Sequence, residues 1–485
     1  MIEFFNTMGG KMETFHPLQK GIVKLYTCGP TVYDFAHIGN HRAYIFEDLL
    51  KRFLLFMGYD VIHVMNITDV DDKTIKGANE QGVPLEKYTE KYIKAFFDDL
   101  ETLGIMKADH YPRATENIQE MASLVKGLLE KGYAYEKEGN YYFSIAKFKD
   151  YGKLSHIHKR ELKAGVRIDS DEYEKEDVQD FALWKARKEG EPYWETEIGS
   201  GRPGWHIECS VMSTKYLGNT FDIHCGGVDN IFPHHENEIA QSEAYTGKKF
   251  VNYWLHCQHL IRDGQKMSKS RGNVITVPEL IKNHGADPMA IRLLLLSTHY
   301  RKILNFTFEA LDQAKSSLER IQEFVTNLGS LPLREGENPE ISSLVEKSKA
   351  KFIQGLSHDL NISPSLSAIF EMIKKANILI DQGNFFRTDT ENLLREIASI
   401  NKVLHVVNFP SNTRVKERMK IGQDVEVEIM ERTLPQDIEQ KVEERERARQ
   451  QKNYALADRI RDELLAHGVV LEDTKDGVRW KIIKK

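Results

Sequence analysis

Residues 23–65 contain two short apolar runs separated by an amphipathic run, and this pattern constrains the fold more than any other part of the sequence. The run 23–29 predicts a buried strand. From His37 onward, apolar residues recur with a period near 3.6, which predicts a helix that ends at Gly58. The run 61–65 predicts a second buried strand. Strand, helix and strand joined by short links form the βαβ unit of a parallel sheet, so we expect an α/β protein.

The length and composition indicate a folded protein of several domains. The chain has 485 residues, more than one hydrophobic core usually organises, so we expect roughly two to four domains. A net charge of −6 argues against a wholly basic nucleic-acid binder but leaves room for a local basic surface that contacts RNA. No secretory signal and no bilayer-spanning apolar run is visible, and only four cysteines occur. We expect a cytoplasmic protein that does not enter a membrane.

The sequence pattern changes several times after the first βαβ unit. Residues 109–199 contain a predicted helix, a hairpin and a charged loop, which indicates an insertion between two halves of one sheet. Strand character returns at 221–226, and a predicted helix over 233–245 leads to an apolar strand over 253–261. Helical periodicity from 278 to 407 then predicts a helical bundle.

Two short motifs are suited to binding a nucleotide. The motif HIGN at 37–40 lies between the first strand and its helix, where open α/β sheets bind ligands and where a helix amino terminus attracts phosphate. Gly39 has no Cβ, so a flat base can approach the backbone, although ordinary helix capping explains the motif equally well. The motif KMSKS at 266–270 lies between Gly264 and Gly272 and can close two lysines over phosphates. The alternative for KMSKS is a solvated basic loop.

Together, HIGN and KMSKS resemble the signature pair of class I aminoacyl-tRNA synthetases. The resemblance implies a Rossmann-like catalytic domain in which an amino-acid carboxylate attacks the α-phosphate of ATP. It implies that the catalytic residues are His37, Asn40, Lys266 and Lys269, and that the ATP site comprises these four residues with Gly39, Asp229 and Ser268. Asn40 replaces the usual second histidine of the signature. Asparagine can still donate hydrogen bonds but cannot become cationic. His41 points about 100° away on the helix and is not a replacement.

The segment 206–238 is dense in side chains that bind metal ions. His234 and Glu238 are four residues apart and share one face of the predicted helix, and Cys209 can add a thiolate from the preceding segment. Cys28 ends the first strand, so a parallel sheet brings it to the same crevice. Two cysteines, a histidine and a glutamate suit zinc. On the sequence alone, further members of the set remain open: His206, Cys225 and His235.

Four further motifs narrow the resemblance to one family. CGPTVYD, NITDVDDK, GRPGWHIECS and FPHHENEIAQS are similar to motifs of the cysteinyl-tRNA synthetases. The likeness implies one zinc ion held by Cys28, Cys209, His234 and Glu238. It implies an amino-acid site that contains Gly29, Thr68, Trp205, His224 and Asp229. Cys225 and Cys257 match no ligand position, and we interpret them as small buried residues.

A metal ion has a physical purpose in such an enzyme. Serine differs from cysteine by one atom, and ordinary pocket contacts separate molecules this similar by only about 1–3 kcal/mol. A metal-bound thiol loses its proton and ligates as a thiolate, whereas an alcohol does so far less well near neutral pH. A separate editing domain is therefore not expected.

The resemblance also implies an order of domains. Residues 1–108 and 200–275 form the catalytic domain, 109–199 a connective insertion, 276–306 a stem-contact region, 307–410 a helical bundle and 411–485 a small α+β anticodon-binding domain. A charged helical run and a β-hairpin that turns near Asp476 and Gly477 end the chain. Trp480 on this hairpin is predicted to stack on an anticodon base of tRNA.

The resemblance implies a monomeric cysteine–tRNA ligase that uses ATP with Mg²⁺, L-cysteine and tRNA(Cys). One alternative is a related ligase that joins activated cysteine to an amino sugar. It would share the catalytic half and the zinc, but the long helical block favours tRNA. Another alternative is a zinc-containing RNA-binding protein without catalysis, and the intact lysine motif argues against it.

Overall fold

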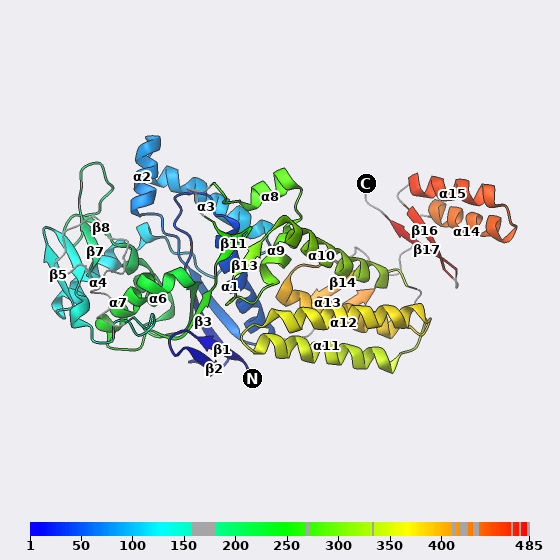
Figure 1. Ribbon diagram of the computed structural model, residues 1–485, viewed down its shortest axis with the longest axis horizontal. Coiled ribbons are helices and arrows are strands. Elements are labelled where there is room, and N and C mark those ends of the chain that lie inside the picture. Colours follow the sequence, from blue (N-terminus) through cyan, green and yellow to red (C-terminus); the bar gives the residue numbers. More distant parts are fainter. Residues whose placement is uncertain are drawn as a thin grey trace. The chain divides into compact units, whose positions relative to one another are not determined.

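The computed structural model describes residues 1–157, 180–267, 272–331, 334–409, 413–417, 425–429, 436–466, 469–474 and 477–482 (Figure 1). These residues form two compact units. The first unit comprises Met1–Lys315 and Ile353–Ser365, and the second comprises Ser316–Phe352 and Leu366–Lys485. Across the described residues, no helix is both long and apolar enough to cross a membrane.

A four-stranded parallel sheet organises the first unit, as the βαβ pattern predicts. Its strands lie in the order β10 (Val251–Cys257), β9 (Phe221–Gly227), β3 (Ile22–Thr27) and β4 (Asp60–Met65), and every neighbouring pair is parallel. Helix α1 (Ile38–Phe56) connects β3 to β4, and α7 (Glu236–Thr246) connects β9 to β10. Both helices are labelled in Figure 1. The chain leaves the two central strands toward opposite edges of the sheet. This reversal creates the crevice where open α/β sheets bind ligands.

The strands are apolar because the sheet is buried. Tyr26 on β3, Val64 on β4 and Trp254 on β10 are completely buried, and they share one cluster with Phe221 and Phe250. Each such side chain contributes roughly 1.5–3 kcal/mol through its removal from water. The cluster fixes the sheet and therefore fixes the ends of its strands.

Two predicted elements differ from the observed ones. The strand predicted over 253–261 is two strands, because the apolar run changes its hydrogen-bonding partner: β10 pairs with β9, whereas β11 (Leu260–Arg262) pairs with β13 (Leu304–Phe306). The other neighbour of β11 is β12 (Gln265–Lys266). The helix predicted over 233–245 is not uniform, because its first residues belong to a wide helical turn over Ile231–His235, and the regular helix α7 begins at Glu236.

The insertion is built around an antiparallel sheet. Its strands lie in the order β5 (Ala134–Lys137), β6 (Asn140–Phe143), β7 (Phe181–Ala186) and β8 (Gly201–Pro203). Helix α4 (Ile118–Glu130) precedes the sheet, and α6 (Trp205–Leu217) follows it directly. One hydrophobic cluster contains Trp184 of β7, Met212 of α6 and Ala240 of α7. The insertion therefore packs against the helices that flank the crevice.

The other elements complete the chain. The first unit also contains β1 (Glu3–Asn6), β2 (Lys11–Thr14), α2 (Asp72–Gln81), α3 (Leu85–Thr102), α8 (Val277–His284) and α9 (Pro288–Leu296). The predicted helical block is confirmed as α10 (Phe308–Leu328), α11 (Pro339–Ser357), α12 (Ile362–Asp381) and α13 (Arg387–Leu404). The last elements are β14 (Thr413–Glu417), β15 (Val425–Ile429), α14 (Gln436–Gln450), α15 (Tyr454–Ala466), β16 (Val469–Thr474) and β17 (Gly477–Ile482).

The carboxyl-terminal part differs from its prediction in one respect. The charged run expected to be one helix is two helices, α14 and α15. The final hairpin is confirmed, since β16 and β17 are antiparallel and Trp480 lies in register with Leu471. Asp476, at the predicted turn, lies outside the described residues.

A buried ion cluster joins α1 to α9. Asp48 on α1 is 3% exposed, its Oδ2 contacts Nη2 of the fully buried Arg292 on α9, and it lies 2.8 Å from Nε of Arg52. The backbone N–H of Met106 donates to Asp48 Oδ1 at 2.8 Å. Burial alone would raise the pKa of Asp48, but the charges of Arg292 and Arg52 outweigh burial and hold this pKa below its usual value. The ionised form of Asp48 therefore depends on Arg292 and Arg52.

Arg292→Met is expected to lower the free energy of unfolding by about 3–5 kcal/mol, because it leaves a buried carboxylate short of positive charge. Urea denaturation followed by circular dichroism measures the loss. The control is Lys76→Met, which removes an exposed ion pair with Glu80 and should leave the unfolding curve nearly unchanged. Because the folded pKa of Asp48 is lowered, its contribution is present at neutral pH and is lost as the pH falls through that pKa. Equal unfolding curves for the two variants would contradict this account.

Candidate active site

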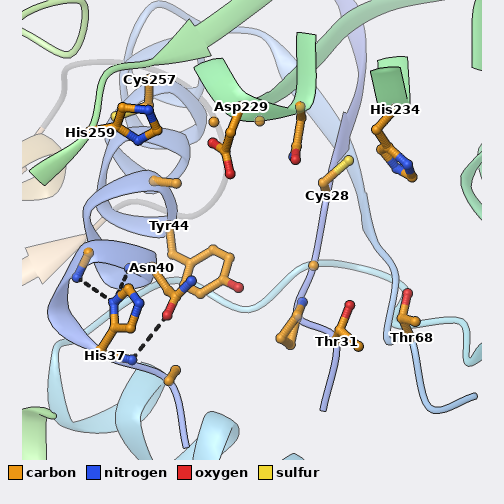
Figure 2. A pocket seen from close by; sticks show the side chains of 18 of the residues that line it. Cys28, Thr31, His37, Asn40, Tyr44, Thr68, Asp229, His234, Cys257 and His259 are labelled. Carbon is orange, nitrogen blue, oxygen red and sulfur yellow. Dashed lines mark hydrogen bonds between the residues drawn. The ribbon is translucent and has the colours of Figure 1, made fainter. Parts of the chain in front are cut away.

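A cavity of about 440 Å³ opens at the carboxyl ends of the central strands. The residues that line it include Cys28 after β3, Asn66 after β4, Gly227 at the end of β9 and Gln258 after β10. In the view of Figure 2, His37 lies on one side of this cavity and the pair Cys28 and His234 lies on the other. The nucleotide and metal motifs predicted from separate parts of the chain therefore border one space.

His37 caps the first turn of α1. Its ring Nδ1 accepts hydrogen bonds from the backbone N–H groups of Gly39 (3.1 Å) and Asn40 (3.3 Å). Asn40 Oδ1 accepts a hydrogen bond from the N–H of His37 at 3.1 Å (Figure 2). Because Nδ1 accepts these hydrogen bonds, the ring proton lies on Nε2. The capping alternative is thus observed, and it fixes the orientation of the His37 ring at the cavity.

The start of α1 approaches the KMSKS motif closely. A Cβ on Gly39 would lie 2.8 Å from Met267 Cε and 2.9 Å from the His37 ring, so only glycine fits without displacing them. Lys266, on β12, is exposed and lines the cavity beside Met267. Ser268 and Lys269, also predicted to contact ATP, lie outside the described residues.

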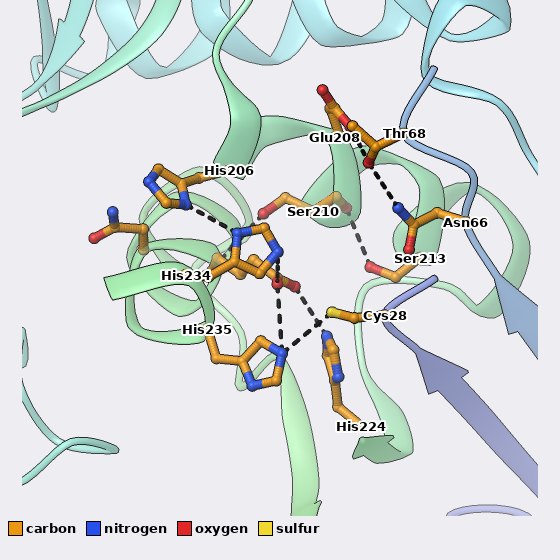
Figure 3. A network of polar contacts seen from close by, with 12 residues as sticks. Cys28, Asn66, Thr68, His206, Glu208, Ser210, Ser213, His224, His234 and His235 are labelled. Carbon is orange, nitrogen blue, oxygen red and sulfur yellow. Dashed lines mark hydrogen bonds and ion pairs between the residues drawn. The ribbon is translucent and has the colours of Figure 1, made fainter. Parts of the chain in front are cut away.

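Four predicted metal ligands converge at the inner part of the cavity. The ligand atoms of Cys28, Cys209, His234 and Glu238 all lie within 4.8 Å of one another. His234 Nε2 and Glu238 Oε1 are 3.0 Å apart, so the i, i+4 spacing does bring this pair together. Cys28 directly follows β3, Cys209 lies on α6, His234 lies in the turn Ile231–His235, and Glu238 lies in the first turn of α7. Figure 3 shows Cys28 and His234 close together. The sheet and its flanking helices therefore assemble the group.

A second group of possible metal ligands consists of Cys28, Glu238, His224 and His235. Cys28 and Glu238 belong to both groups. The two added histidines are completely buried and do not line the cavity, whereas Cys28, Cys209 and His234 do. The first group therefore borders the cavity through three of its members, and the second group through Cys28 alone.

The donors of the first group fit a metal ion. Glu238 Oε1 is buried and, although close to His234, has no hydrogen-bond partner among the described residues. Burial raises the pKa of the Cys209 thiol, but hydrogen bonds with Cys28 and His234 outweigh burial and hold this pKa at about 6. Burial also raises the pKa of Glu238, but His224 and His234 lower it to about 2. These contacts favour the thiolate of Cys209 and the carboxylate of Glu238, which are ligating forms, while they raise the pKa of Cys28 and that of His234, to about 10. A metal ion bound here would displace the protons of Cys28 and His234.

The buried His224 contacts a member of this group but does not line the cavity. His224 Nε2 lies 2.9 Å from Glu238 Oε2, and its ring stacks on Trp254 with centroids 4.6 Å apart (Figure 3). The family likeness implied that His224 belongs to the amino-acid site; His224 is not among the residues that line the cavity, and its substrate role stays a prediction. Of the residues left open, His206 lies with its Nδ1 3.0 Å from His234 Nδ1, and Cys225 belongs to neither group.

A hydrogen-bonded chain that sequence analysis missed runs from the amino-terminal hairpin to the group. Thr7 Oγ1 lies 2.8 Å from His256 Nδ1, and His256 Nε2 lies 2.8 Å from His235 Nδ1. His235 Nε2 in turn lies 3.2 Å from Cys28 Sγ. In the sequence, His256 was visible only as a histidine within the strand predicted over 253–261, and nothing identified Thr7 as its hydrogen-bonding partner.

Two predicted substrate residues, Gly29 and Thr68, line the cavity and belong to one hydrogen-bond network. Thr68 Oγ1 donates to the buried Glu208 Oε2 at 2.7 Å (Figure 3). Asn66 Nδ2 donates to Thr68 Oγ1 at 3.2 Å, and Asn66 Oδ1 accepts from the Gly29 N–H at 2.9 Å. Sequence analysis missed both Asn66 and Glu208. Their hydrogen bonds hold Thr68 and the backbone beside Cys28 in one arrangement.

Trp205 and Asp229 occupy other parts of the same space. Trp205 lines the cavity, is 42% exposed and stacks on the His234 ring with centroids 4.3 Å apart. Asp229 also lines the cavity, where Figure 2 shows its carboxylate between His234 and Cys257. Cys225 and Cys257 are both free and buried, as predicted, and Cys257 also borders the cavity.

Comparison with known proteins agrees with this geometry. Residues 14–316 match the family of tRNA synthetases class I (C) catalytic domain, and residues 431–480 match the Cysteinyl-tRNA ligase anticodon binding domain. The chain is 48% identical to the cysteine–tRNA ligase of Chlamydia pneumoniae, over 99% of this chain and 98% of that protein. It is 46% identical to the cysteine–tRNA ligase of Koribacter versatilis, over 99% of both chains.

Solved structures show the same fold. The structure of Mycobacterium tuberculosis methionyl-tRNA synthetase in complex with methionyl-adenylate superposes with a TM-score of 0.63, although only 16% of residues are identical. The similarity covers 79% of this chain and 92% of the other. It supports the Rossmann-like fold, while the full-length relatives identify the family. The chain belongs to the cysteinyl-tRNA synthetases, the class I enzymes that act as cysteine–tRNA ligases.

Proposed function

We propose that the chain activates L-cysteine with ATP and Mg²⁺, transfers it to tRNA(Cys), and selects cysteine by means of one zinc ion. The observation that carries the proposal is the convergence of Cys28, Cys209, His234 and Glu238 on a cavity that His37 and Lys266 also border. The reacting groups of an amino acid and a nucleotide would meet in this space. We expect the enzyme to act as a monomer.

The donor set favours zinc over harder cations. Two sulfurs, one imidazole nitrogen and one carboxylate oxygen are typical zinc ligands, whereas Mg²⁺ and Ca²⁺ prefer oxygen. When bound there, zinc supplies a Lewis acid that favours a thiolate over a hydroxyl near neutral pH, which would discriminate against serine. Trp205, stacked on His234, would then cover the substrate side chain.

The chain's own residues would position ATP and stabilise charge. His37 Nε2–H donates to a phosphate oxygen, and the Lys266 ammonium adds positive charge as pyrophosphate leaves. Asp229 accepts hydrogen bonds from ribose hydroxyls. The cysteine carboxylate forms a bond to the α-phosphorus while the bond to pyrophosphate breaks. The terminal ribose hydroxyl of tRNA then attacks the carbonyl carbon of the adenylate, and AMP leaves. No side chain forms a covalent intermediate, so positioning supplies much of the rate.

Gly29→Ala is expected to lower kcat/KM for cysteine by about tenfold to a hundredfold. A Cβ at this position would lie 1.7 Å from the backbone oxygen of Asn66, so the chain beside Cys28 has to move. Cysteine-dependent exchange between ATP and pyrophosphate measures the effect. An unchanged kcat/KM would show that the chain near Gly29 does not position the substrate.

The proposal as a whole is tested with two assays of the purified, zinc-loaded protein. Cysteine-dependent ATP–pyrophosphate exchange is expected, and its absence would favour an RNA-binding protein without catalysis. Charging of a tRNA(Cys) transcript is also expected. If cysteine were joined to an amino sugar but not to tRNA, the alternative ligase would be correct. The match of residues 431–480 to an anticodon binding domain supports tRNA, with Trp480 of β17 as the proposed stacking residue.

A further inference from the structure

The loop between β3 and α1 carries an exposed aromatic side chain at the rim of the cavity. Phe35 lines the cavity and is nevertheless 45% exposed. Its ring meets Tyr92 of α3 edge to face, with centroids 5.1 Å apart. This contact steadies the ring but leaves nearly half of the residue open to solvent. Trp205, the other cavity-lining aromatic of comparable exposure, is already stacked on His234.

Two lysines stand beside aromatic rings at this rim. Lys91 Nζ lies 5.2 Å from the ring centroids of both Phe35 and Tyr92. Lys73 Nζ lies 5.2 Å from the ring centroid of Tyr33, and Lys73 and Tyr33 both line the cavity. Neither lysine forms an ion pair with a carboxylate of the described residues, and both are exposed. Their charges are therefore available to a ligand.

Nearby carboxylates are largely engaged. Asp34 accepts a hydrogen bond from the N–H of Phe35 at 2.7 Å. Asp72, next to Lys73, pairs with Lys185 at 2.9 Å and with Arg202 at 2.5 Å. Asp72 is therefore paired with cations other than Lys73.

The backbone of the loop is held in place. Tyr88 Oη donates to the Tyr33 carbonyl at 2.7 Å, and Val32 N–H donates to the Thr68 carbonyl at 3.1 Å. A ring on such a loop is already positioned before a ligand binds, which lowers the entropy lost on binding.

We propose that Phe35, flanked by Lys73 and Lys91, is the surface on which an unpaired base at the 3′ end of tRNA stacks while the terminal ribose reaches the cavity. The proposal rests on the proposed function, because transfer to tRNA requires single-stranded nucleotides to cross this rim. An aromatic face stacks on any base, and neighbouring lysines contact the backbone phosphates. The alternative is that no RNA binds here and that the Phe35 ring serves only to pack against Tyr92.

The test compares Phe35→Ala with a matched variant, Tyr245→Ala. Tyr245 is 38% exposed and has Lys131 Nζ 5.4 Å from its ring centroid, but it does not line the cavity. For Phe35→Ala, tRNA-independent ATP–pyrophosphate exchange should stay within about twofold of wild type. Its kcat/KM for tRNA charging should fall about 5- to 100-fold, as expected for the loss of one stacked base. Tyr245→Ala should match wild type in both assays, and Phe35→Tyr should restore charging.

A second readout separates stacking from altered packing. Wild type should bind intact tRNA more tightly than tRNA that lacks its last three nucleotides, whereas Phe35→Ala should bind both equally. Lys91→Gln should flatten the dependence of log affinity on log salt by about 0.7 for intact tRNA only. The proposal is overturned if Phe35→Ala keeps the difference between the two tRNAs, or if it loses exchange activity. Absence of exchange in wild type would instead overturn the proposed function.

Discussion

Cys209→Ser is expected to lower cysteine activation by at least about a thousandfold and to remove bound zinc, since metal catalysis and binding of this kind supply several kcal/mol. Cys209 is 2% exposed, and its contacts with Cys28 and His234 hold its pKa at about 6. A serine hydroxyl has no anionic form at neutral pH and cannot replace this ligand. Pyrophosphate exchange and metal analysis of the purified variant measure the two losses.

Cys257→Ser is the matched control for this prediction. Cys257 is also 2% exposed and also borders the cavity, but it belongs to neither group of metal donors. Burial raises its pKa to about 12, so it is a neutral thiol in the folded protein. This variant should keep its zinc and activate cysteine at a rate within severalfold of wild type. If Cys209→Ser kept both its zinc and its cysteine activation, the proposed ligand set would be contradicted.

His37→Asn is expected to lower kcat for adenylate formation by about 100- to 1,000-fold, because it removes the Nε2–H that we propose donates to phosphate. Asparagine is a good N-cap residue and can accept the hydrogen bonds that Gly39 and Asn40 now donate to the ring. The stability of α1 should therefore hardly change, and zinc content should match wild type. Single-turnover adenylate formation measures the effect.

His37→Ala separates the two roles of this residue. It removes the phosphate donor and also the helix cap, so it should show the same loss of kcat and a further loss of about 1 kcal/mol of stability. If His37→Asn formed adenylate as fast as wild type while His37→Ala did not, the residue would act only as a cap.

Several features could be predicted because they depend on local pattern or on motifs. The period of apolar residues after His37 was enough to predict α1, and the βαβ rule then required β3 and β4 to be parallel. Cys28 and Cys209 come from distant parts of the chain; the expected parallel sheet placed Cys28 at the crevice, and the resemblance to a family then selected the four ligands among the candidates left open. Their convergence with His234 and Glu238 in space agrees with that expectation.

Other features depend on partners that no local pattern reveals. The family likeness implied a substrate role for His224, which stays a prediction, but no local pattern revealed that its Nε2 lies 2.9 Å from Glu238 Oε2. The boundary between β10 and β11 was missed because an apolar run does not show where its hydrogen-bonding partner changes. Asp48 and Arg292 are 244 positions apart, and only the packing of α1 on α9 pairs them.

The central claim is that a metal ion in the sheet crevice recognises the sulfur of the amino acid. The most direct test measures zinc per chain and the ratio of exchange rates with cysteine and with serine in the same preparation. Ordinary contacts would give a ratio of roughly 10 to 200. The account predicts one zinc per chain and a ratio well above that range. An active protein without zinc, or one with a ratio inside that range, would contradict it.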